Sequence, residues 1–144
     1  MPERSARNTA MDLLARRDHS RHELQQKLKQ RGFESEEIES ALNYLQRENL
    51  QSDRAYAESY LRSRQQKGFG PVRIEYELRD RGVSETIISD CLQLAQDDWE
   101  NVLNSERCKK YGLDIPKEYP ERMKQARFLQ NRGFSSEMVM RLFR

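Results

Sequence analysis

Residues 23–42 read ELQQKLKQRGFESEEIESAL, and the same pattern returns as RIEYELRDRGVSETIISDCL over residues 73–92 and as KQARFLQNRGFSSEMVMRLF over residues 124–143. The glycines of these segments, Gly32, Gly82 and Gly133, lie 50 and 51 residues apart. Counted from each glycine, the position four before it and the positions six and ten after it are always apolar. A register kept on both sides of a glycine at this period predicts tandem units that pack one on the next.

Each unit is predicted to contain three helices. In the first unit, apolar residues spaced three and four apart form three separate stripes, which are Ala6, Ala10, Leu13 and Leu14, then Leu24 and Leu28, then Ile38, Leu42 and Leu45. Ser20 and Glu23 have the spacing of a capping box at the start of the second helix. Gly32 is expected just past the end of that helix, and Ser35 is expected to cap the third.

We therefore predict an all-α fold, an elongated array of three tandem three-helix repeats over residues 1–50, 51–96 and 97–144. No useful length of the chain alternates with period two, so no sheet is expected. Leu, Ile, Val and Phe together number 29 of 144 residues, and 26 basic residues nearly balance 24 acidic ones. Low apolar content with balanced charge fits helices that each bury one narrow stripe better than it fits a compact globule.

Several classes of protein are excluded by the same composition. Without a run of about 18 apolar residues or the apolar stretch of a signal peptide, the chain is expected to be cytoplasmic, and Cys91 and Cys108 are expected to be reduced thiols. His19 and His22 are interpreted as solvated polar residues at a helix start rather than as metal ligands. No catalytic, cofactor-binding or metal-ligating residue is predicted, so we do not expect an enzyme.

The segment Gly68-Phe-Gly-Pro71 invites comparison with a phosphate-binding loop. It has neither the GxxxxGK[ST] motif nor the third glycine of GxGxxG, and no apolar strand precedes it. The preferred interpretation is a connector, in which Gly68 ends one helix in the left-handed region and Pro71 begins the next. The aromatic residues nearby are expected to belong mainly to the core, with Phe69 as the exception because it lies in the loop; they are Tyr56, Tyr60, Phe69 and Tyr76.

Basic residues concentrate in two acid-free segments. One runs from Ser59 to Ile74 and the other begins at Arg122, and both cover helices that precede a repeat glycine. The helices that follow Gly32 and Gly82 are acidic or lack bases, which argues against a helix-turn-helix protein that inserts them into the DNA major groove. The candidate residues for binding a filament or DNA are Arg62, Arg64, Lys67, Arg73, Arg122, Lys124, Arg127 and Arg132.

Several of these residues belong to a recognisable signature. The stretch DRAYAESYLRSR over residues 53–64, followed by KGFGP over residues 67–71 and by Ile74, Glu77, Leu78, Arg81 and Gly82, closely resembles the central signature of the bacterial RecX regulatory proteins. RDHSRHEL over residues 17–24 and RFLQNRGF over residues 127–134 resemble the first and third repeats of that family. The resemblance extends over nearly the whole chain.

The resemblance implies a non-enzymatic regulatory protein that binds the RecA filament on single-stranded DNA and inhibits its recombinase, ATPase and co-protease activities. Its expected partners are the RecA recombinase filament and single-stranded DNA, reached directly or through the filament, with no membrane and no cofactor. We expect it to act as a monomer in homologous recombination, DNA repair and the SOS response. The alternative is a stand-alone protein that coats single-stranded DNA without sequence specificity.

Overall fold

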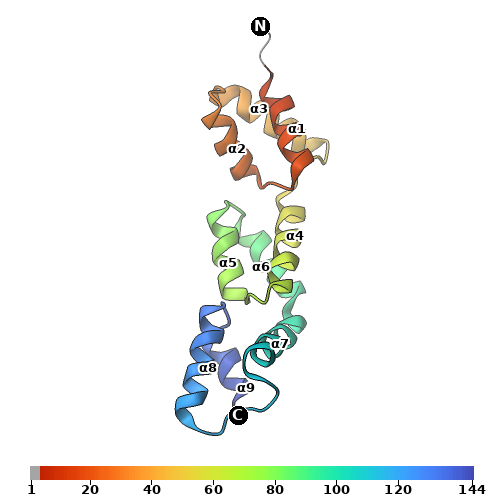
Figure 1. Ribbon diagram of the computed structural model, residues 1–144. Helices are drawn as coiled ribbons and strands as arrows, with labels where there is room; N and C mark the ends of the chain where they lie inside the picture. The colour runs from red at the N-terminus through yellow and green to blue at the C-terminus, as the bar shows by residue number, and fades with distance from the viewer. Residues whose placement is uncertain (1–3) are drawn as a thin grey trace. The chain divides into compact units, whose positions relative to one another are not determined.

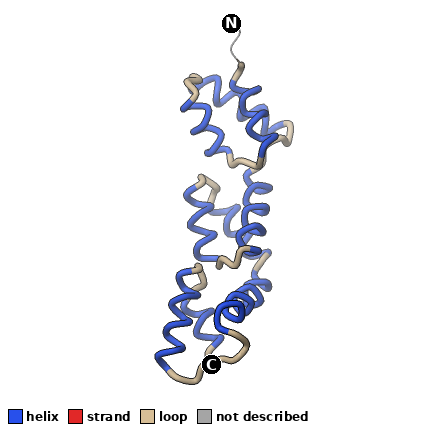
Figure 2. The backbone as a smooth tube through the Cα atoms, viewed as in Figure 1, coloured by secondary structure: helices blue, strands red, loops and turns tan. Residues whose placement is uncertain are grey.

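The computed structural model describes residues 4–144, and every regular element in that part of the chain is helical (Figures 1 and 2). In chain order the elements are α1 (Ala6–Arg16), α2 (Arg21–Gln30), α3 (Ser35–Arg47), α4 (Asp53–Gln66), α5 (Pro71–Asp80), α6 (Glu85–Leu94), the 3-10 helix η1 (Gln96–Asp98), α7 (Trp99–Tyr111), α8 (Tyr119–Asn131) and α9 (Ser136–Leu142). The predicted all-α fold of three-helix repeats is confirmed. The first three residues of the first predicted repeat lie outside the described residues.

The described chain forms two compact units. The first unit contains the residues up to Ser59 together with Leu78–Ile88, and the second contains Tyr60–Glu77 together with Ser89–Arg144. Helices α4, α5 and α6 therefore contribute residues to both units. Boundaries at residues 50 and 96 remain predictions, drawn from the helical repeat.

In the first unit, α1, α2 and α3 pack around one apolar core (Figure 1). Each predicted stripe faces that core: Leu24, Leu28 and Leu45 are fully buried, while Leu14 packs against its edge. Three narrow stripes suffice because each helix presents only one face to the other two.

Local signals set the ends of these helices. The predicted capping box is present, since the Ser20 side chain accepts the Glu23 N–H and the Glu23 side chain accepts the Ser20 N–H. The prediction that Ser35 caps the third helix is wrong: Ser35 is the first helical residue, and the cap position is held by Glu34 without a side-chain hydrogen bond. The cap position lies two residues after the repeat glycine. In the first repeat Glu34 occupies it, whereas in the third repeat it is occupied by Ser135, whose side chain does cap α9.

In the second unit, α7, α8 and α9 pack together around buried Trp99, Leu103, Leu129, Phe134 and Val139. The repeat glycines Gly32, Gly82 and Gly133 all have positive φ, as the sequence predicts for residues just past a helix end. No helix among the described residues combines the length and the apolar character that crossing a membrane requires.

Candidate functional site

The turn after α4 places Phe69. Gly68 adopts a φ of +86°, its N–H donates to the Gln65 carbonyl at 2.9 Å, and the Phe69 N–H donates to the Arg64 carbonyl at 3.0 Å. This is the helix end that Gly68 predicts. A Cβ atom at position 68 would also lie 2.0 Å from the carboxyl carbon of Glu106, so a side chain here would require the Glu106 carboxylate to move.

Three guanidinium groups surround the half-buried Phe69 ring. The Cζ atoms lie 3.9 Å from the ring centroid for Arg64, 4.4 Å for Arg73 and 4.2 Å for Arg132. The three arginines come from α4, from α5 and from the residue that ends α8. We call Phe69 and these three arginines the Phe69 cluster. The attraction of a cation to an aromatic face helps to hold three like charges close together.

Glu77 offsets part of this positive charge. Its carboxylate accepts from Nε and Nη2 of Arg64 at 3.0 Å each, from the Tyr60 hydroxyl at 2.9 Å and from Nε of Arg73 at 3.4 Å. Burial alone would raise the pKa of Glu77, but the hydrogen bonds from Tyr60 and Arg64 hold that pKa below its usual range. Glu77 is therefore ionised at neutral pH and fixes Arg64 beside the ring.

Glu106 on α7 is the second carboxylate of the site. Its Oε1 lies 3.1 Å from Nη2 of Arg132, and its Oε2 lies 3.5 Å from Nζ of Lys109. Three guanidinium groups thus meet two carboxylates. The Phe69 cluster keeps a net positive charge, and Arg73 is the most exposed of its three arginines, with 43% of its side chain accessible.

Backbone groups join the turn at Phe69 to the turn after α8. The Gly70 N–H donates to the Arg132 carbonyl and the Val72 N–H donates to the Gly133 carbonyl, both at 2.9 Å. The Arg132 side chain donates in return to the carbonyls of Lys67 and Gly68. We call this contact the Gly70–Gly133 joint. It brings the two acid-free segments of the sequence together.

The first unit contains a related joint. The Ser20 hydroxyl, at the start of α2, donates at 2.7 Å to the Arg81 carbonyl in the turn after α5, and a Cβ atom at Gly82 would lie 2.3 Å from Cβ of His22. In both joints, the residues before the second helix of one repeat meet the glycine turn that ends the second helix of the following repeat. The turn at Gly32 has no such neighbour, since a Cβ atom there would meet nothing within 4 Å.

The other predicted cations lie outside the Phe69 cluster. Four are exposed and take part in none of the ion pairs found among the described residues; these are Arg62, Lys67, Lys124 and Arg127. Lys67 follows α4 directly and its carbonyl is part of the joint, whereas Arg62 lies about 200° around the helix from Arg64. Arg122 is half-buried, and its Nε donates to the Pro116 carbonyl at 2.8 Å.

The aromatic residues divide as follows. Tyr56 belongs to the core as predicted, and burial raises its pKa to about 12. Phe69 is the predicted exception. Tyr76 was expected in the core, but 66% of it is exposed on α5, so that prediction is wrong.

His19 also differs from the prediction of a solvated residue. It is 2% exposed, its Nδ1–H donates to the Arg17 carbonyl at 2.9 Å, and its Nε2 accepts from the Lys27 ammonium at 2.9 Å. In residues 4–144 no group of three or more His, Cys, Asp or Glu side chains is arranged to hold a metal ion. Neither Cys91 nor Cys108 forms a disulfide.

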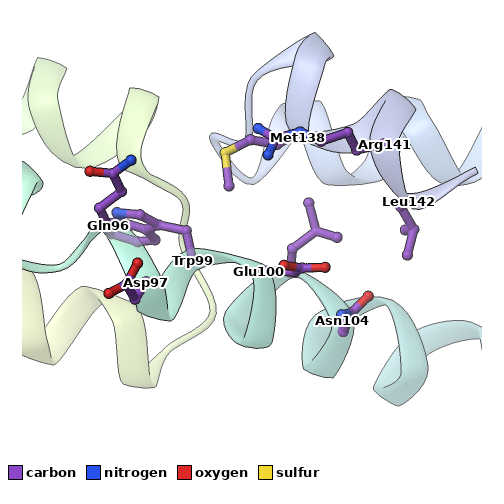
Figure 3. Close-up of a pocket in the computed structure, with 9 residues that line it drawn as sticks. Gln96, Asp97, Trp99, Glu100, Asn104, Met138, Arg141 and Leu142 are labelled. Atoms are coloured by element: carbon purple, nitrogen blue, oxygen red, sulfur yellow. The ribbon is translucent and has the colours of Figure 1, made fainter.

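The second unit also has a pocket of about 330 Å³ between α7 and α9 (Figure 3). Trp99, Met138 and Leu142 are apolar residues of its lining, and Asp97, Glu100 and Arg141 are charged ones. The pocket does not include any of the predicted site residues.

Sequence reasoning missed Glu77, Glu106 and the buried Arg107. Of these, only Glu77 could have been inferred from the sequence, because it follows Arg73 by four residues on one helix, the spacing of an ion pair. The pairing of Glu106 with Arg132 depends on how α7 packs against α8, which no local spacing reveals.

Sequence models of three consecutive domains match this chain. They are described as RecX, first, second and third three-helix domain, and they match residues 6–45, 52–92 and 96–143. The chain belongs to the RecX family. The resemblance that the residues predict is thereby confirmed.

Individual RecX proteins agree with this assignment. The chain is 45% identical over 138 residues to the regulatory protein RecX of Pseudomonas tolaasii. These aligned residues cover 96% of this chain and 89% of that protein. It is 41% identical to the regulatory protein RecX of Halorhodospira halophila, over 94% of this chain and 84% of that protein.

Solved RecX structures share the fold. The crystal structure of RecX from Lactobacillus salivarius matches with a TM-score of 0.76 at 26% identity, over 93% of this chain and 89% of that one. A second crystal structure of a regulatory protein RecX matches with a TM-score of 0.78 at 27% identity, over 94% of this chain and 68% of that one.

Proposed function

We propose that this RecX-family protein binds the RecA filament on single-stranded DNA and inhibits its recombinase, ATPase and co-protease activities. The family's regulatory name supports a binding role, and the Gly70–Gly133 joint is the observation that carries the proposal. The joint gathers cations from two repeats into one region of the second unit. In this proposal the protein acts in the cytoplasm as a monomer, without catalysis or cofactor.

The proposed binding surface has two kinds of cation. Arg64 and Arg132 are tied to Glu77, Glu106 and backbone carbonyls, so we assign them mainly to positioning. Arg73 within the Phe69 cluster, Lys67 beside it, and Lys124 and Arg127 on α8 have exposed side chains that can reach a partner's phosphates or carboxylates. Each exposed contact is weak, but several contacts made together on a polymer reinforce one another.

The alternative, a protein that coats single-stranded DNA on its own, receives less support from the Phe69 cluster. A stacking platform needs a free aromatic face. Three guanidinium groups within 4.4 Å of the Phe69 centroid occupy the space that a stacked base would need. The Phe69 ring is therefore better placed to bind the arginine side chains than to stack on a nucleobase.

Charge reversal on α8 tests the proposal. Replacing Lys124 and Arg127 with Glu should weaken inhibition of the filament's ATPase by about five- to tenfold, because each change removes an attraction of up to about 1 kcal/mol and adds repulsion. Both residues are exposed, so helicity measured by circular dichroism should be unchanged.

The matched control replaces Lys29 and Arg31 with Glu. These exposed cations flank the end of α2 in the first repeat and belong to neither acid-free segment of the sequence. Equal loss of inhibition in both double variants would mean that only net charge matters. A salt titration completes the test, since tighter binding of the wild-type protein to naked single-stranded DNA than to the filament would contradict the proposal in favour of the alternative.

A further inference from the structure

The third repeat differs from the other two in the connection between its first and second helices. Residues 17–20 and 67–70 make four-residue connections, whereas residues 112–118 make a connection of seven. Helix α8 also begins 14 residues before Gly133, while α2 and α5 begin 11 residues before their own glycines. The third repeat thus has a longer loop and one extra helical turn at the same place.

This added segment carries exposed apolar side chains. Leu113 is 85% exposed, Tyr119 is 70% exposed and Ile115 is 46% exposed. We call residues 112–119 the apolar loop. Three large apolar side chains facing solvent within seven residues are unfavourable in isolation, and exposed apolar patches often mark surfaces that bind other proteins.

Two arginine side chains donate hydrogen bonds to the backbone carbonyls of the apolar loop. Arg107 on α7 is 2% exposed, and its Nη2 and Nη1 donate to the carbonyls of Leu113 and Asp114 at 3.1 Å each. Arg122 on α8 donates to the Pro116 carbonyl at 2.8 Å. The Gly112 N–H continues the helical hydrogen bonding to the Cys108 carbonyl at 2.9 Å.

Burying a guanidinium group is costly unless its donors are satisfied. The Nη1 and Nη2 groups of Arg107 donate hydrogen bonds to the loop backbone and to Gln125, and its Nε is buried without a partner among the described residues. The charge is therefore directed at loop carbonyls rather than at an acid. The result is a loop whose backbone is already ordered while its apolar side chains point outward, and such pre-ordering lowers the entropy lost on binding.

We propose that the apolar loop is a protein-docking surface that inserts Leu113, with Ile115 and Tyr119 beside it, into an apolar hollow on a protein partner. Resting on the proposed function, that partner is a protomer of the recombinase filament. Nucleic acid is the poorer fit, because exposed Asp114 and Glu118 outnumber Lys117 in the loop and would repel phosphates. Aliphatic Leu113 and Ile115 also cannot stack on bases as aromatic rings do.

The test compares Leu113→Ser with Leu94→Ser. Both leucines are exposed, 85% and 79%, so neither change should alter the thermal unfolding of the full chain. Binding is measured to the recombinase filament on single-stranded DNA and to the same DNA alone. We expect Leu113→Ser to weaken filament binding about tenfold, as loss of one buried leucine would, and to change naked-DNA binding less than twofold. Leu94→Ser should change neither affinity.

Each other outcome overturns a specific statement. Equal filament binding by Leu113→Ser and Leu94→Ser overturns the docking role of the loop while leaving the proposed function standing. Equal weakening of filament and naked-DNA binding by Leu113→Ser makes the loop a nucleic-acid contact. A wild-type chain that self-associates in sedimentation, with Leu113→Ser monomeric, makes the partner a second copy. A wild-type chain that does not bind the filament contradicts the proposed function and the partner assigned here with it.

Discussion

His19 is a buried histidine whose environment favours the neutral ring. Its Nε2 accepts from the Lys27 ammonium and its Nδ1–H donates to the Arg17 carbonyl. Burial is the main cause that lowers the pKa of His19 below its ordinary value of 6.5, and the charges of Arg17 and Lys27 add to it. Protonation would break the bond from Lys27 and place two cations together.

This predicts a pH-dependent stability of the first unit. Because the folded-state pKa is depressed, the unfolded chain binds the proton more readily, so the contribution of His19 is full above pH 6.5 and is lost as the pH falls through the folded-state pKa. Urea denaturation of the wild-type chain should show falling stability between pH 7 and pH 5. His19→Gln should flatten that slope, and its stability at pH 7 should be about 1 kcal/mol lower, since a buried hydrogen bond is lost.

Two features isolate the effect of His19. Glu23, whose burial would raise its pKa, is held below its ordinary 4.5 by the Ser20 N–H and Arg17, so its contribution is lost only at more acidic pH. His22, the other histidine, is exposed and serves as the control. A slope that His22→Gln removes as completely as His19→Gln would refute the assignment to His19.

At the scale of elements, the glycine turns act as docking points between repeats. Gly82 and Gly32 both have positive φ, 80° and 90°, and both end the second helix of a repeat. They differ in their surroundings, because a Cβ atom would lie 2.3 Å from His22 Cβ at position 82 and would meet nothing at position 32. Comparing substitutions at Gly32 and Gly82 therefore separates the cost of backbone strain from the cost of disrupting the contact between repeats.

Gly32→Ala should lower the free energy of unfolding by about 1 kcal/mol, the strain of a left-handed alanine. Gly82→Ala should lose the same amount and roughly 1–3 kcal/mol more, because the added methyl group is forced against the start of α2. Urea denaturation monitored by circular dichroism measures both. Equal losses in the two variants would show that the turn at Gly82 does not depend on its contact with His22.

The elements themselves were largely predictable from sequence. Apolar spacing and the repeat glycines predicted the helices, and Ser20 with Glu23 predicted a helix start. The errors arose where tertiary contacts override local spacing. Tyr76 lies seven residues after Phe69, a spacing that suggested core packing, but it points to solvent. His19 precedes a helix start, yet it is buried and contacts Gln51 and Lys27. Of the candidate site, the cations and Phe69 could be predicted, but Glu77 and Glu106 could not be assigned as their partners.

At the scale of the whole molecule, the Gly70–Gly133 joint places the basic segments of two successive repeats next to each other, where they form the candidate binding surface. The loop Gly68-Phe-Gly-Pro71 connects two helices, as predicted, and the N–H groups of Gly70 and of Val72, just after the loop, donate to carbonyls in the turn of the next repeat. This joint lies between the cations of the second repeat and those of the third, because it links the backbone of Gly70 and Val72 to that of Arg132 and Gly133. Function should then depend on residues that carry no charge.

Gly133→Ala tests this dependence. A Cβ atom there would lie 2.4 Å from Arg73 Cβ and 2.9 Å from the Arg73 backbone nitrogen, so the joint must open. We expect the amides of Gly70 and Val72 to exchange hydrogen faster and inhibition of the filament's ATPase to fall several-fold, although every cation remains. Gly32→Ala, with similar backbone strain and no neighbour, should leave both readouts unchanged. Faster exchange at Gly70 and Val72 with undiminished inhibition would mean that the cations act independently of the joint.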